Sequence, residues 1–254
     1  PNAIQLDIVY VERPIDDARL GDELWRYTDQ IAAIDQKHRE TMRRNGFRVG
    51  VVGSNPPLAL QQMLGLKSDF VYEPDAEKAK GLVGHRSVIQ SGGQTEIQTS
   101  PIYRECSIEL PGSGESGRRS YTNVVCKYHI TAERLQDGWV QLDFVPQIHY
   151  GDEQLRRDVG DDGWRLSNKQ RTATFFPQRF QVKLSVGEMA LVTADDDAEG
   201  RLGELFFRGP QALAPNNDVL PGETHTASSP TVQRILVVRL AGMSGGGAPH
   251  SPSQ

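Results

Sequence analysis

The sequence has few cysteines, no long apolar run and no excess of positive charge. Its 254 residues include only two cysteines, without a Cys-x-x-Cys pair, so a zinc site made of thiolates is not expected. No stretch of about 18 apolar residues occurs, so a membrane-spanning segment is not expected either. The net charge is -5 and both signs are mixed along the chain, which predicts no nucleic-acid partner.

Motifs that define a catalytic or metal site are also missing. The six histidines include no His-x-His or His-Glu-x-x-His spacing. His129 and His149 lie in strands that we expect to be neighbours. With Asp143 or Asp152 they make one candidate metal or acid–base group, although we expect both histidines to lie on a strand surface instead. We therefore expect a non-enzymatic protein with no bound cofactor.

Turn-forming residues are abundant, and the first 66 residues mix strands with helices. The 25 glycines and 15 prolines suit a β-rich chain with many turns. Alternating apolar residues predict strands at 4–11 and 47–52, and helical spacing predicts helices over 20–31, 35–46 and 58–64, with Asp35 as an N-cap. This order describes a small β-α-α-β-α module whose two strands are expected to pair. The polar residues 67–80 predict a linker.

From residue 81 onward the pattern is almost wholly β, and two of the expected strands hold the cysteines. Cys106 and Cys126 face each other only if the loop between their strands extends to residues 119–120, which would permit a disulfide in an oxidising compartment. A loop that ends at Gly117 leaves two free thiols, the alternative that we favour.

Residues 154–171 are polar and are expected to interrupt the β region. Residues 244–254 predict a disordered tail.

Four β segments follow one another in the second half of the chain. The first runs from an Asp137-Gly138 turn through residues 139–146. The second is a hairpin of residues 180–184 and 189–193 around a Gly187-Glu188 turn. The third reads Leu-Gly-Glu-Leu-Phe at residues 202–206, and the fourth reads Ile-Leu-Val-Val-Arg-Leu at residues 235–240. In this order and rough spacing, residues 125–240 resemble the C-terminal β-module of the bacterial secretin family, whose members form outer-membrane rings.

The resemblance implies an α+β fold with an order of domains along the chain. We expect the small α/β module at residues 1–66, the linker at 67–80, a mainly antiparallel, secretin-like β domain at 81–243 and the tail at 244–254. An acidic run at residues 195–200 replaces the proline-rich gate segment of the family, so we expect a soluble relative that does not build the pore.

Such β-modules extend one another edge to edge, so the resemblance also implies a structural protein that forms a homo-oligomer or joins a larger envelope assembly. Large aromatic side chains are candidates for the interface, and core packing is the alternative for each of them. These candidates are Trp139, Phe144, Phe180, Phe206 and Phe207.

The chain begins at Pro1 rather than at a methionine, so we expect either a removed leader or a fragment. A removed leader would place the protein in the periplasm or cell envelope. Two alternative functions remain. One is a monomeric extracytoplasmic β-domain that binds a ligand such as a glycan or calcium, through exposed tryptophans or acidic loops such as residues 195–197. The other is a hydrolase whose catalytic residues the sequence does not reveal.

Overall fold

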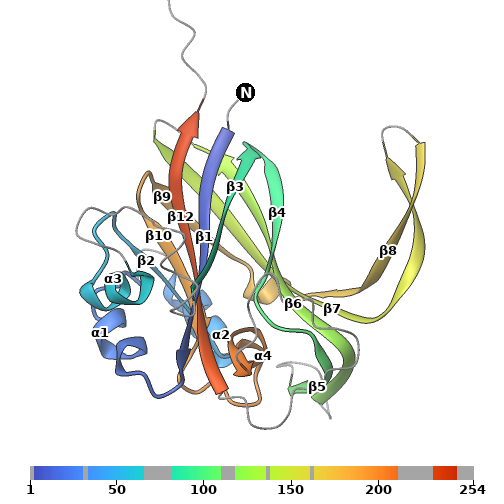
Figure 1. Ribbon diagram of the computed structural model, residues 1–254, viewed down its shortest axis with the longest axis horizontal. Coiled ribbons are helices and arrows are strands. Elements are labelled where there is room, and N and C mark those ends of the chain that lie inside the picture. The colour runs from blue at the N-terminus through green and yellow to red at the C-terminus, as the bar shows by residue number, and fades with distance from the viewer. Residues whose placement is uncertain are drawn as a thin grey trace, which may run out of the picture.

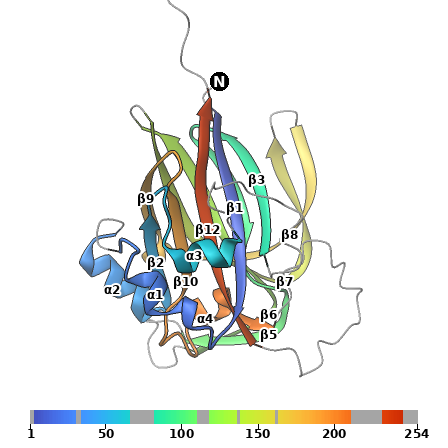
Figure 2. The ribbon, with the colours of Figure 1, turned by 60° about the vertical axis from the view of Figure 1, so that its left-hand side comes forward.

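Strands dominate the computed structural model, which describes residues 3–30, 34–65, 82–109, 118–135, 138–160, 163–210 and 231–244. They form two antiparallel sheets that pack face to face, and short helices cover the outer side of the first sheet (Figure 1, Figure 2). This is an α+β fold with a majority of strand, as predicted from the sequence.

The first sheet has the order β2-β10-β12-β1-β3, with β11 beside β12. Its strands are β1 (Ala3–Pro14), β2 (Phe47–Val52), β3 (Leu82–Gln90), β10 (Met189–Ala194), β11 (Arg208–Pro210) and β12 (Thr231–Ser244). The second sheet has the order β4-β6-β7-β8, with β5 beside β6 and β9 beside β7. Its strands are β4 (Gly93–Gln98), β5 (Tyr103–Glu109), β6 (Arg118–Arg134), β7 (Trp139–Gly160), β8 (Gly163–Thr174) and β9 (Phe180–Ser185).

Both faces of the first sheet are buried along β10 and the middle of β12. Strand β10 and the middle of β12 are apolar at successive positions, the pattern expected of strands that are covered on both sides. The inner side chains, such as Ile8 and Val238, pack against the second sheet. The outer side chains, such as Val237, pack under α1 (Asp22–Trp25), α3 (Leu58–Leu64) and the 3-10 turn η1 (Ala18–Leu20).

A cluster of aromatic rings joins the two sheets. Tyr128 of β6 is fully buried and makes edge contacts with Phe47 of β2 and with Phe144 and Phe180 of the second sheet. The rings of Phe144 and Phe180 stack with centroids 4.7 Å apart. Because each of these rings buries a large apolar area, the cluster fixes how the sheets lie on each other.

The segment at residues 202–207, expected as a β element, is instead the helix α4 (Leu202–Phe207). Gly203 explains the difference. Its amide donates to the carbonyl of Asn45 at 2.8 Å, and a Cβ atom at this position would lie only 1.8 Å from the carbonyl oxygen of Gly46. This close approach brings the helix against the turn before β2, where Phe206 and Phe207 enter the aromatic cluster.

The helix α2 (Gln36–Arg44) matches its prediction, because the Asp35 side chain accepts a hydrogen bond from the amide of His38 at 3.0 Å.

The strands of the first sheet pair with partners more distant in the sequence than expected. Strands β1 and β2 do not pair with each other, since β10 and β12 lie between them. Strands from residues 1–66 and from residues 81–243 therefore share one sheet. The expected linker at 67–80 and the expected tail beyond Ser244 lie outside the described residues.

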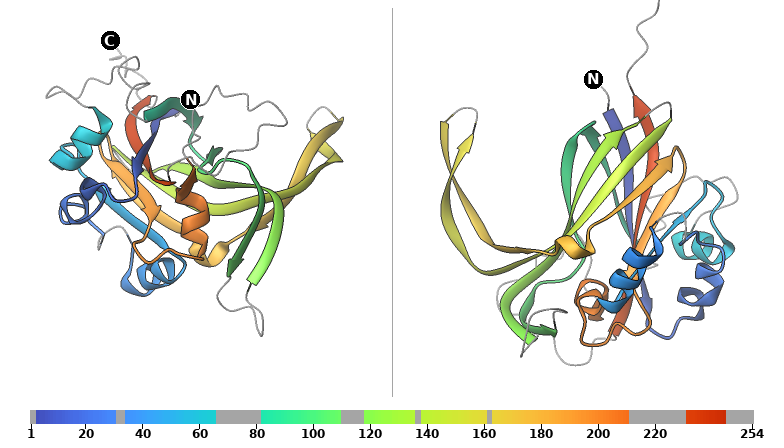
Figure 3. Two further views of the ribbon diagram at one scale, coloured as in Figure 1. Left: turned by 60° about the horizontal axis from the view of Figure 1, so that its bottom comes forward. Right: turned by 180° about the vertical axis from the view of Figure 1, so that it is seen from behind.

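The second sheet divides where β6 and β7 separate. These strands pair as far as Val125 and His149; beyond that point β6 pairs with β5, and β7 pairs with β8. Within the described part of the chain, residues 154–160 and 163–169 pair only with each other. They form a two-stranded ribbon, here named the β7–β8 arm, which projects away from the helices (Figure 1, Figure 3). The expectation that residues 154–171 interrupt the β region is therefore wrong.

Side-chain hydrogen bonds support the point of division. Asn123 of β6 has a φ of 50° and Gly151 of β7 has a φ of 78°, so both strands bend there. The Gln170 amide nitrogen donates to the carbonyl oxygens of Asn123 and Gly151, each at 2.9 Å. These bonds supply donors for two carbonyl groups at the place where the strands part.

A buried ion pair joins β1 and β12. Arg234 is fully buried and donates to Glu12 at 2.8 Å, directly across the strand pair. Substitution Glu12→Gln should lower the free energy of unfolding by about 3–5 kcal/mol in urea denaturation, because it leaves a buried guanidinium without its counter-charge. The matched control is Asp7→Asn, which removes the carboxylate that pairs with the exposed Arg86 and lies 3.9 Å from Arg239, and it should cost less than about 1 kcal/mol. Equal costs for the two variants would contradict this account.

Candidate functional site

The five predicted interface aromatics separate into two groups. Four of them lie in the core between the sheets, each 2% exposed or less; these are Phe144, Phe180, Phe206 and Phe207. Core packing, the alternative named for each, accounts for their positions. Trp139 differs because it begins β7 with 44% of its surface exposed. An interface role for Trp139 therefore remains a prediction.

The two cysteines are free thiols on neighbouring strands. Cys106 pairs in register with Tyr121, whereas Cys126 is five residues further along β6 and pairs with Ile148 of β7. A disulfide would need Cys106 and Cys126 to lie opposite each other, and the register of β5 and β6 does not bring them together. Burial raises the pKa of Cys106 to about 11 and also raises the pKa of the fully buried Cys126.

These thiols should react slowly in the native protein. A pKa of about 11 leaves Cys106 with about 100-fold less thiolate at neutral pH than an ordinary cysteine, since the thiolate is the reactive form. Maleimide labelling of native protein should therefore be slow and should accelerate as the pH rises toward 11. After unfolding in urea without reductant, both thiols of each chain should be labelled. No labelling in urea would show a disulfide and contradict the structure.

The candidate histidine group is not assembled as a site. His129 and His149 pair with Val145 and Val125, so they do not oppose each other. Asp143 is occupied by an ion pair with Arg179, and Asp152 accepts a hydrogen bond from Asn123. Burial together with the nearby Lys127 lowers the pKa of His149. Among the residues that the structure describes, no group of three or more His, Cys, Asp or Glu side chains is arranged to hold a metal ion.

The acidic run considered for calcium is paired with arginines. Asp195 is almost fully buried and accepts from Arg43 at 3.0 Å, and Asp196 lies 3.6 Å from a guanidinium nitrogen of Arg48. The guanidinium of Arg48 also lies over the ring of Trp25, the buried last residue of α1. The carboxylates of this run thus attach α2 and β2 to the loop after β10.

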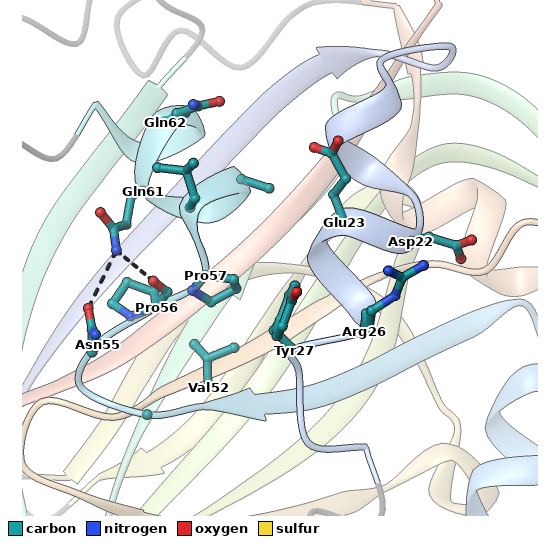
Figure 4. A pocket seen from close by; sticks show the side chains of 13 residues that line it. Asp22, Glu23, Arg26, Tyr27, Val52, Asn55, Pro56, Pro57, Gln61 and Gln62 are labelled. Carbon is teal, nitrogen blue, oxygen red and sulfur yellow. Dashed lines mark hydrogen bonds between the residues drawn. The ribbon is translucent and has the colours of Figure 1, made fainter.

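An open groove of about 1000 Å³ lies between α1 and α3, on the outer side of the first sheet (Figure 4). One wall carries Asp22, Glu23 and Arg26, and the other carries residues of the turn and helix from Asn55 to Gln62. The side chain of Tyr27 stands between these walls, near Pro57. The lining thus combines one exposed aromatic ring with charged and amide groups.

The position of Tyr27 follows from its buried neighbours. Thr28 is buried and donates to the carbonyl oxygen of Leu24 at 2.7 Å, and its methyl group packs on Gly50, where a Cβ atom would lie 2.3 Å away. Asp29 then pairs with Val51 of β2 in an isolated bridge. Because Thr28 and Asp29 hold the chain after Tyr27 to β2, the Tyr27 side chain points outward, and 69% of its surface is exposed.

Searches against protein-family models, curated proteins and solved structures each find no match. Within the described residues, no helix has both the length and the apolar character needed to cross a membrane.

Sequence reasoning overlooked both the groove and the arm. The groove is assembled from α1, the end of β2 and α3, and no local pattern shows that these elements converge. The arm had a local signal, since Val159, Trp164 and Leu166 alternate with polar residues around a Gly-Asp-Asp-Gly sequence at residues 160–163. The many charged residues between the apolar ones hid this alternation.

Proposed function

We propose that this chain is a non-enzymatic structural protein of the bacterial cell envelope that self-associates or joins a larger assembly. The β7–β8 arm carries the proposal. A two-stranded ribbon is at best marginally stable alone in water, and no other described strand pairs with residues 154–160 or 163–168. A partner that adds a strand or covers a face of the arm would stabilise the ribbon.

The register of the arm strengthens this argument. Positions 155, 157 and 159 lie opposite 168, 166 and 164, so these six positions belong to one face of the ribbon. The sequence places Leu, Val, Trp and Leu at four of these six positions. An apolar face of this kind on a projecting element is typical of a protein–protein contact.

Two further observations support assembly. Strand β3 lies at one end of the first sheet and pairs with β1 alone among the described strands, so its outer edge offers a second place for strand addition. The resemblance of residues 125–240 to the secretin β-module favours edge-to-edge association and an envelope location. Under this proposal the protein is periplasmic or attached to the cell envelope.

Light scattering coupled to gel filtration tests the proposal. The wild-type chain should elute with at least twice the monomer mass at high micromolar concentration. The triple substitution Val159→Ser, Trp164→Ser and Leu166→Ser should yield a monomer, because it removes the apolar face of the arm.

The matched control substitutes the opposite face of the same ribbon, through Arg156→Ser and Lys169→Ser. This variant should keep the wild-type mass, since it leaves the apolar positions intact. A wild-type chain that stays strictly monomeric would exclude self-association. An assembly that both variants preserve would show that the arm is not the contact.

A further inference from the structure

The groove between α1 and α3 is separate from the arm. The helices cover the first sheet, whereas the arm leaves the second sheet on the opposite side of the molecule (Figure 1, Figure 3). The groove therefore needs an explanation other than assembly through the arm. Its size lies at the upper end of the range for small-molecule sites, and it is open rather than enclosed.

The walls of the groove are preformed. Leu24 and Trp25 fix α1 to the sheet from below, and Leu60 and Met63 fix α3 in the same apolar cluster. On the α3 side, the Gln61 amide donates to the carbonyl oxygen of Pro56 at 2.7 Å and approaches the Asn55 side-chain oxygen at 3.4 Å (Figure 4). A ligand would bind a surface that is already ordered, so little conformational entropy of the protein would be lost on binding.

The lining matches the chemistry of a sugar chain. The Tyr27 ring is an exposed flat apolar surface, suited to stacking against the C–H face of a pyranose. Glu23, Arg26 and Gln62 are exposed planar groups that offer both acceptors and donors to hydroxyls, and a hydroxyl can use both at once. An open groove of this kind admits an extended polymer rather than a small compact ligand.

The charge of the groove narrows the ligand class. Two carboxylates, Asp22 and Glu23, lie on the same wall of the groove as one guanidinium, Arg26. This excess of negative charge disfavours acidic polysaccharides, because like charges repel. We propose that the groove binds a neutral saccharide chain, with Tyr27 as the stacking platform and the polar side chains of both walls as partners for its hydroxyls. This inference does not depend on self-association.

Affinity electrophoresis tests the inference with hydroxyethylcellulose, galactomannan and dextran as neutral probes and polygalacturonate as an acidic probe. At least one neutral polymer should retard the wild-type chain, and polygalacturonate should not. Substitution Tyr27→Ala should weaken the retardation about tenfold or more, since it removes the stacking surface.

The matched control is Phe176→Ala, which removes another exposed ring, 66% exposed, outside the groove. It should leave binding unchanged. Tyr27→Ala should keep the wild-type urea midpoint and the wild-type mass, so that lost binding reports on the groove alone. Three results would overturn the inference: no retardation by any neutral polymer, retardation by polygalacturonate alone, or binding that Tyr27→Ala leaves intact.

Discussion

The pairing of β1 with β12 determines how the rest of the chain is arranged. Twelve residue pairs join these strands in the middle of the first sheet, although more than 200 residues separate them in the sequence for pairs such as Glu12 and Arg234. Strand β10 adds to the other side of β12, and β2 adds to β10. The sheet therefore cannot form from the N-terminal residues alone, and α1 and α3 have an outer face to cover only once β10 and β12 are in place.

Two surfaces follow from this arrangement. The helices that cover the first sheet leave a groove between α1 and α3, whose walls are held by apolar side chains on the sheet below. The second sheet packs on the inner face through the rings around Tyr128, and beyond that core it divides so that β7 and β8 continue alone. The core thus positions a groove on one side of the molecule and an arm on the other (Figure 3).

Local patterns predicted much of the secondary structure but not the partners of the strands. Alternation identified β1 and β2, the Gly187-Glu188 turn marked the hairpin of β9 and β10, and Asp35 marked the start of α2, because these signals depend on residues close in sequence. Alternation shows which face of a strand is buried and does not show which strand lies beside it, so the separation of β1 from β2 was missed. The helix α4 depends on the approach of Gly203 to Gly46, a contact between distant segments. The groove likewise depends on the packing of three separate elements.

Hydrogen exchange at several protein concentrations tests most directly the claim that the β7–β8 arm is the assembly surface. Backbone amides at residues 154–160 and 163–169 should exchange quickly in dilute protein and become protected as concentration rises, while amides of β1 and β12 stay protected throughout. Exchange in the arm that does not change with concentration, while the measured mass increases, would contradict the account.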